Sequence, residues 1–247
     1  MRYFAKVKFV GTDFFGFQVQ PDKRTVQGEL SRALQETFSS PVRITGCSRT
    51  DAGVHANELC ITVDTEGAAI PPEKLPLAIS RFLPEDLSLI YAKECDDKFH
   101  VRHDVKYKEY VYRIKNSRIR DPFEVNRSWF LPRPIDESAL AKMNEAASYL
   151  VGCHDFRAFM AEGSDVTDTT RNVTELSVER SGDIITVRVC ADGFLYNMVR
   201  IIVGTLVEVA YGRFTPKDVF EILNSGKRVN AGMTAPPGGL YLNRVVY

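Results

Sequence analysis

Apolar residues recur at helical and strand spacing along the first part of the chain. Val26, Leu30, Leu34 and Phe38 are four residues apart, which places them on one face of a helix. Shorter apolar segments separated by turn residues predict strands, and a second helix follows. The expected elements are strands over 3–10, 42–47, 58–63 and 87–92, and helices over 25–38 and 72–82. Their order is β-α-β-β-α-β.

The remaining sequence predicts a second series of strands and helices. Asp136 is suited to cap a helix and Gly152 to end it, with an apolar stripe between them. Thr215, Pro216 and Asp218 form a helix-start signal of a capping hydroxyl, a first-turn proline and a carboxylate. The expected elements are strands over 110–114, 173–179, 184–189 and 240–246, and helices over 136–150, 194–211 and from 215 to a stop at 226.

The two parts share an order of elements, although no residue-level repeat connects them. We therefore expect an α+β protein with two α/β halves, residues 1–104 and 105–247. If their sheets join side by side, a cleft forms where the loops of one half meet the strands of the other. Such a cleft is a favourable place for an active site.

Composition narrows the class of protein. A chain of 247 residues that is 44% hydrophobic can bury a substantial core. No apolar stretch approaches the roughly 20 residues that a membrane-spanning helix needs, and charges interrupt the N-terminal segment. The five cysteines are odd in number and lack Cys-x-x-Cys spacing, which disfavours a disulfide framework or a thiolate zinc site. We expect a soluble, cytoplasmic protein with no membrane partner.

Positive charge is concentrated between Lys98 and Arg120, although the formal net charge of the whole chain is zero. Eight lysines and arginines in this segment face only two acidic residues. A solvated strand face is one reading of such a run. Tyr107, Tyr110 and Tyr112 lie among the cations, and cations beside stacking rings also suit an RNA groove.

The segment 46–56 contains Arg49, Asp51 and His55 among small residues. A capped turn, with Asp51 bonded to backbone amides, is a purely structural reading of it. A metal site is disfavoured, because zinc sites need three or four ligands and the other histidines offer no matching pair. The chain also lacks the glycine-rich fingerprints of nucleotide binding and the Gly-x-Ser-x-Gly nucleophile elbow.

Six blocks, this segment included, resemble the tRNA pseudouridine synthase A family when taken in order, from end to end of the chain. The departures are small: Phe17 stands where the family usually has tryptophan, and Ser48 where glycine is common. The blocks are Gly11-Thr-Asp-Phe-Phe-Gly-Phe-Gln18 with Thr25-Val-Gln27, Arg49-Thr-Asp-Ala-Gly-Val-His-Ala56, Lys108-Glu-Tyr-Val-Tyr112, Gly152-Cys-His-Asp-Phe156, Phe194-Leu-Tyr-Asn-Met-Val-Arg200 and Ala235-Pro-Pro-Gly-Gly-Leu240.

The resemblance implies a role for four residues. Asp51 corresponds to the catalytic nucleophile, Tyr110 to the base-stacking tyrosine, Arg200 to the arginine paired with the aspartate, and Arg49 to an arginine implicated in base flipping. The chemistry agrees, since a nearby guanidinium keeps a carboxylate charged and fixes its direction. Arg200 also lies in an otherwise apolar predicted helix and therefore needs a partner.

The resemblance further implies the pseudouridine synthase fold, with two ferredoxin-like halves, a joined antiparallel or mixed sheet and a central basic cleft. The implied reaction isomerises uridine to pseudouridine at positions 38–40, in the anticodon stem-loop of tRNA, and the implied assembly is a homodimer. An isomerisation needs no cofactor and no metal. Attack at C1′, addition at C6 and elimination to a glycal all remain open as the covalent step. The alternative is a noncatalytic RNA-binding or chaperone module of the same fold.

Overall fold

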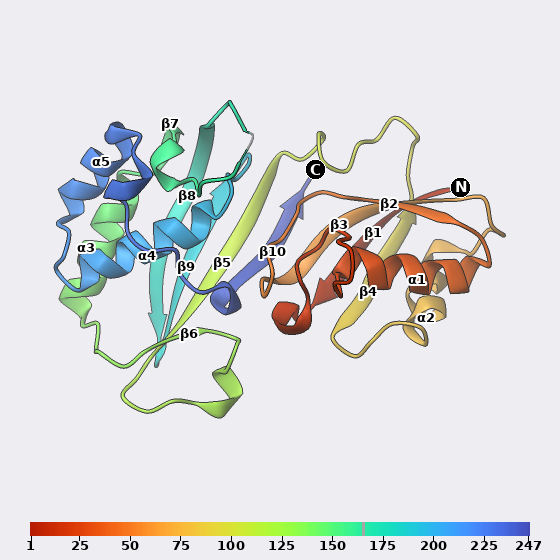
Figure 1. Ribbon diagram of the computed structural model, residues 1–247, viewed down its shortest axis with the longest axis horizontal. Coiled ribbons are helices and arrows are strands. Elements are labelled where there is room, and N and C mark those ends of the chain that lie inside the picture. Colours follow the sequence, from red (N-terminus) through yellow and green to blue (C-terminus); the bar gives the residue numbers. More distant parts are fainter. Residues whose placement is uncertain (165) are drawn as a thin grey trace. The chain divides into compact units, whose positions relative to one another are not determined.

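The computed structural model describes residues 1–164 and 166–247, which form two compact units (Figure 1). Unit 1 comprises residues 1–106 together with 241–247, and unit 2 comprises residues 107–240. The boundary near residue 105 was expected, but the last strand was expected in the second half. It belongs to unit 1 because it pairs in parallel with a strand there, through Tyr241 opposite His55 and Leu242 opposite Ala56.

Unit 1 has the predicted order β-α-β-β-α-β, followed by the returning C-terminal strand. Its sheet has the strand order β4-β1-β3-β10, and β2 pairs with β3. The β1–β3, β1–β4 and β2–β3 pairs are antiparallel. The elements are β1 (Arg2–Phe9), α1 (Val26–Phe38), β2 (Val42–Gly46), β3 (His55–Thr65), α2 (Leu75–Ser80), β4 (Leu87–Glu94) and β10 (Leu240–Val246).

The helices of unit 1 follow their sequence signals, with one correction. The Thr25 hydroxyl caps α1 by accepting a hydrogen bond from Gly28 N at 3.2 Å, and the predicted face of α1 is buried. The predicted helix over 72–82 is shorter than expected. It is a 3-10 turn, Pro72–Lys74, followed by six residues of α-helix. Prolines at 72 and 76 have no N–H to donate and confine regular hydrogen bonding to short pieces.

Unit 2 contains mostly antiparallel strands, with helices packed against them. The strand order is β5-β9-β8-β7, and the short β6 pairs in parallel with β5. Within this unit, α3 packs on β8 and on α4, and α5 packs on α3 (Figure 1). The elements are β5 (Tyr107–Asn116), β6 (Trp129–Leu131), α3 (Glu137–Ser148), β7 (Gly152–Asp155), β8 (Thr170–Ser181), β9 (Ile184–Ala191), α4 (Met198–Ala210) and α5 (Pro216–Ser225).

The capping signals of unit 2 are confirmed. Asp136 accepts a hydrogen bond from Ala139 N at 2.8 Å, and Thr215 and Asp218 form a reciprocal capping box. By contrast, α4 begins four residues later than predicted, because Asn197 adopts the left-handed conformation with φ of 58°. Strands β6 and β7 were not predicted, since each is only three or four residues long.

The buried side chains of each unit form its core between sheet and helices. Helix α4 is buried on most sides, as its composition predicts, and contributes ten buried residues. Within the described part of the chain, no helix is both long and apolar enough to cross a membrane.

Candidate active site

Arg49 and Asp51 lie on the loop that connects β2 to β3, residues 47–54, which we call the Asp51 loop. Backbone hydrogen bonds hold it, among them one from Cys47 N to Cys60 O at 2.9 Å. Phe17 N donates to Thr50 O at 3.1 Å, Gly53 N donates to Phe14 O at 3.2 Å, and Val54 N donates to Asp51 O at 3.2 Å. The loop therefore rests on the segment before α1 as well as on its own turn.

Two glycines allow this close approach. A Cβ at Gly11 would lie 1.9 Å from Val54 O, and a Cβ at Gly16 would lie 2.6 Å from Thr50 O. Gly16 also has φ of +85°, which side-chain-bearing residues rarely adopt. The block 11–18 therefore packs directly against the backbone of the block 49–56.

His55 closes the other end of the loop as a structural residue. Its side chain is 1% exposed, and its Nδ1 accepts a hydrogen bond from Gly11 N at 2.9 Å. Its ring stacks on Tyr241 with 4.6 Å between centroids. Among the described residues, no cluster of three or more histidines, cysteines or carboxylates could hold a metal ion.

The three central residues of the loop differ in exposure. Arg49 is exposed, Thr50 is buried, and Asp51 is half-buried. Within the described chain, the Thr50 hydroxyl has no hydrogen-bond partner. Asp51 thus lies at a boundary between protein and solvent.

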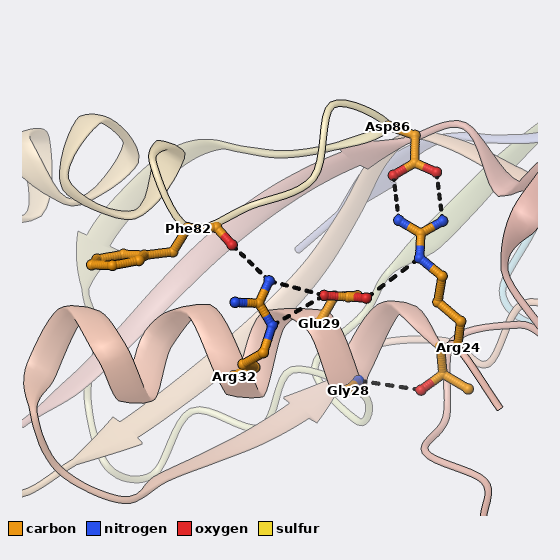
Figure 2. Close-up of polar contacts among 7 residues, drawn as sticks. Arg24, Gly28, Glu29, Arg32, Phe82 and Asp86 are labelled. Atoms are coloured by element: carbon orange, nitrogen blue, oxygen red, sulfur yellow. Dashed lines mark hydrogen bonds and ion pairs between the residues drawn. The ribbon is translucent and has the colours of Figure 1, made fainter. Parts of the chain in front are cut away.

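An ion-pair network secures the segment under the loop (Figure 2). Arg24 forms a two-point contact with Asp86, both distances being 2.8 Å, and also reaches Glu29 at 3.4 Å. The hydrogen bond to Asp86 holds the pKa of the Arg24 guanidinium above its usual value. The same guanidinium lies 4.2 Å from the ring of Phe14, and Arg24 O accepts a hydrogen bond from Phe15 N. Arg24 therefore joins α1, the turn before β4 and the segment that carries the Asp51 loop.

Tyr110 lies on β5 in unit 2, and its side chain is 7% exposed. Its ring meets Phe194 edge to face, with 4.9 Å between centroids. Tyr112, two residues further on the same strand face, is fully buried and donates to Pro236 O at 2.7 Å. Burial raises the pKa of the Tyr112 hydroxyl, and the positive charge of Arg200 opposes that rise. The charge of Arg200 therefore acts on Tyr112, which lies on the same strand face as Tyr110.

Arg200 lies in the first turn of α4, and its side chain is held from two sides. Nε donates to Ala235 O at 2.7 Å, and one terminal nitrogen donates to the Asn197 side-chain oxygen at 2.7 Å. Ala235 N in turn donates to Arg200 O at 3.1 Å. Asn197, which the sequence analysis quoted without a role, thus orients the guanidinium. Its left-handed backbone is not visible in the sequence.

The loop over residues 228–239 presses closely on α4. A Cβ at Gly204 would lie 1.8 Å from Met233 O, and Gly232 N donates to the Thr205 hydroxyl at 3.0 Å. Arg228 donates to Gly232 O at 3.0 Å and to the Thr234 hydroxyl at 3.1 Å. Burial lowers the pKa of Arg228, and Glu162 opposes that shift. This loop presents Ala235 to Arg200 as a fixed acceptor.

Part of the predicted basic segment is neutralised inside unit 2. Arg113 forms an ion pair with Glu124 at 2.7 Å. Lys115 lies 3.3 Å from Asp183 and 3.8 Å from Asp121. These two cations are partners of acidic side chains.

Comparison with known proteins identifies the family of the chain. The model of the tRNA pseudouridine synthase family matches residues 5–104 and 146–247. The chain belongs to this family. The matched ranges contain Arg49, Asp51 and Arg200, whereas Tyr110 lies between them.

Curated members of the tRNA pseudouridine synthase family align over nearly the whole chain. The tRNA pseudouridine synthase A of Thermoanaerobacter sp. (strain X514) is 43% identical over 241 residues, which cover 98% of this chain and 97% of that protein. The enzyme of the same name from Brevibacillus brevis is 46% identical and covers 96% of each chain. That of Bacillus licheniformis is 43% identical over 100% of this chain and 99% of its own. The α+β fold and the family resemblance predicted from the sequence are thereby confirmed.

Arg49 and Asp51 are thus two residues apart on one braced loop of unit 1, whereas Tyr110 and Arg200 belong to unit 2. The roles of all four residues stay predictions, as does the pairing of Asp51 with Arg200. Asn197, Ala235 and Arg24 are positioning residues that the sequence analysis missed. Asn197 and Ala235 lie in the sequence blocks Phe194–Arg200 and Ala235–Leu240, although neither was assigned a role.

Proposed function

We propose that this chain isomerises uridine to pseudouridine in tRNA and that Asp51 is the nucleophile. Membership of the tRNA pseudouridine synthase family supports the reaction and the substrate. The observation that carries the assignment of Asp51 is its position. It is a half-buried carboxylate on a loop held by backbone hydrogen bonds and by two glycines in close contact with the loop backbone. Such preorganisation aims a reacting group without further reorganisation.

The reaction balances without a redox partner. The bond from uracil N1 to ribose C1′ breaks, the base turns, and a bond forms from C5 to C1′. The hydrogen on C5 leaves as a proton, and N1 gains one. A carboxylate serves this chemistry either by attacking the nucleoside or by stabilising the separated sugar.

The other three residues have roles that support Asp51. Arg200 pairs with the carboxylate, keeps it ionised and directs it, and Asn197 and Ala235 support this role by holding the guanidinium. Tyr110 stacks on the extruded uracil. Arg49, which is exposed, fills the space that the base leaves. Extruding a base costs on the order of a few kcal/mol, which these contacts offset.

The test is the release of tritium from tRNA labelled at C5 of uridine. Asp51→Asn keeps the shape of the side chain and removes its charge, so we expect a loss of at least about 1,000-fold in rate. Asp22→Asn is the matched control. Asp22 is an exposed aspartate of the same unit with φ of 55°, a conformation that asparagine accepts. We expect the control to keep full activity.

Folding and tRNA binding of Asp51→Asn are checked by circular dichroism and filter binding. Pseudouridine formation by this variant at the wild-type rate would refute the nucleophile. A wild-type chain that binds tRNA and releases no tritium would instead support the noncatalytic RNA-binding module.

The proposal includes the finer features implied by the family resemblance. The target uridines lie at positions 38–40 of the anticodon stem-loop, and the enzyme is a cytoplasmic homodimer that uses no cofactor and no metal. Mapping of pseudouridine in tRNA from cells with and without the enzyme tests the positions. Light scattering tests the assembly, for which we expect twice the 27.8 kDa mass of one chain.

A further inference from the structure

A small cavity lies beside the Asp51 loop in unit 1. Its volume is about 190 Å³, and it is lined by the segment before α1, by α1 itself, by β2, by Arg49 and by Arg102. It therefore brings together a residue of the Asp51 loop and two parts of unit 1 that are distant in the sequence. Nothing in the family assignment of Arg49 or Asp51 accounts for it.

Three arginines line this cavity, and none of its described lining residues is a carboxylate. They are Arg43, Arg49 and Arg102, all exposed. Across residues 1–164 and 166–247, none of the three forms an ion pair. Three like charges around one small space repel one another unless an anion lies between them.

Three other arginines of unit 1 differ in this respect. Arg2 pairs with Asp64 at 3.4 Å, Arg24 with Asp86, and Arg32 with Glu29 at 3.1 Å. Unit 1 therefore has carboxylates that neutralise arginines elsewhere on its surface. At the cavity, by contrast, three arginines lie together, and a bound anion would neutralise their charge.

The walls of the cavity are already fixed. The Gln27 side chain accepts a hydrogen bond from Val19 N at 3.1 Å and donates one to Ile44 O at 3.2 Å, so it braces the wall. The ring of Phe17 packs against Gly46, where a Cβ would lie 2.5 Å from the ring. The guanidinium groups are the charged donors left to face a ligand. Their planar forks suit an oxyanion with several oxygens, above all a phosphate.

We propose that this cavity binds a backbone phosphodiester of the RNA substrate, close to the nucleotide that Asp51 attacks. Arg49 lines the cavity and precedes Asp51 by two residues, so their Cα atoms are at most about 7 Å apart. A phosphate held there belongs to the target nucleotide or to a near neighbour. This inference rests on the proposed function, and it adds Arg43 and Arg102 as the residues that position the strand.

The first test is the salt dependence of tRNA binding by Arg43→Gln/Arg102→Gln. Arg49 is left unchanged, because its proposed role in base flipping would mix two effects. The loss of one phosphate contact should lower the slope of log K against log salt by about 1. The matched control is Lys74→Gln/Arg81→Gln, which removes two exposed cations of unit 1 outside the cavity. We expect its slope to be that of the wild type.

The second test locates the phosphate. Single methylphosphonates, which are neutral, are placed in turn at each phosphate near the target uridine of a stem-loop RNA. At one position we expect the wild type to bind roughly 10-fold or more weakly, and Arg43→Gln/Arg102→Gln to be insensitive. Equal losses for both proteins at every position, or an unchanged salt slope, would overturn the cavity as a phosphate site.

The two proposals fail in different ways. Absence of tritium release by the wild type would refute the synthase activity, whereas the salt slope and the methylphosphonate pattern concern binding alone. A wild type that releases tritium and a cavity variant that matches the control would refute only the phosphate site.

Discussion

The Asp51 loop is held by contacts between backbone atoms. The Arg200 side chain is held instead by hydrogen bonds that it donates to Ala235 O and to the side-chain oxygen of Asn197. The first arrangement depends on the absence of side chains at Gly11 and Gly16. The second depends on the presence of one particular amide. A proposed nucleophile and its proposed partner are therefore sensitive to opposite kinds of substitution, namely the addition of atoms in unit 1 and their removal in unit 2.

Among the residues that hold Asp51 and Arg200 in place, the largest effect is expected for Gly16→Ala. The new methyl group would meet Thr50 O and would also force alanine to adopt φ of +85°. We expect about 3 kcal/mol of lost stability and a fall in activity of about 100-fold, because the Asp51 loop must shift. Urea unfolding and tritium release measure the two.

Gly212→Ala is the control for Gly16→Ala. Gly212 has φ of +78°, and no atom of the described residues lies within 4 Å of an added Cβ. Gly212→Ala therefore tests the cost of the left-handed backbone conformation without a steric contact. We expect a loss of about 1 kcal/mol and normal activity. Equal effects of the two substitutions would mean that the contact with Thr50 does not position the loop.

An intermediate effect is expected for Asn197, and two variants separate its two roles. Asn197→Gly keeps the left-handed backbone and removes the hydrogen bond to Arg200, so we expect kcat/KM to fall about 10-fold with little change in stability. Asn197→Ala removes the same bond and adds about 1 kcal/mol of backbone strain. Steady-state kinetics and urea unfolding distinguish them. Full activity of Asn197→Gly would show that Arg200 does not need this amide.

The smallest effect is expected in the network beneath the Asp51 loop. Arg24→Gln breaks the two-point contact with Asp86, and we expect a loss of about 1 kcal/mol with a modest fall in activity. Arg32→Gln, which removes an exposed cation three residues from Glu29, should cost less than about 0.5 kcal/mol. Thermal unfolding compares the stability of the two variants, whose wild-type contacts are drawn in Figure 2. A larger loss for Arg32→Gln would contradict the assignment of Arg24 as the brace.

Periodicity and capping residues predicted most of the elements because these signals are local. The stripe of α1, the cap at Asp136 and the capping box at Thr215 each depend on residues within one or two turns of one another. Strands β6 and β7 were not predicted because a strand of three or four residues is too short to show an alternation of apolar and polar positions. Helix α4 was predicted to be too long because apolar residues occur before Asn197 as well as after it.

The candidate site was found through sequence blocks and not through physical pattern. Around Asp51, spacing alone favoured a capped turn. The supporting residues were harder to find. Nothing near Arg24 in the sequence points to Asp86, and nothing near Arg43 points to Arg102. Their association depends on the pairing of strands and on loops that return from distant parts of the chain.

The sequence by itself determined the order of elements in unit 1, the capped helices of unit 2 and the family to which the chain belongs. Tertiary structure alone decided that strand β10 returns to unit 1, that Gly11 and Gly16 lie against the Asp51 loop, and that three arginines surround one cavity. The physical reason is the range of the interactions. Helix caps and apolar stripes act between neighbours in the chain, whereas parallel strand pairing, close backbone contact and clustered charge act between residues that only folding brings together.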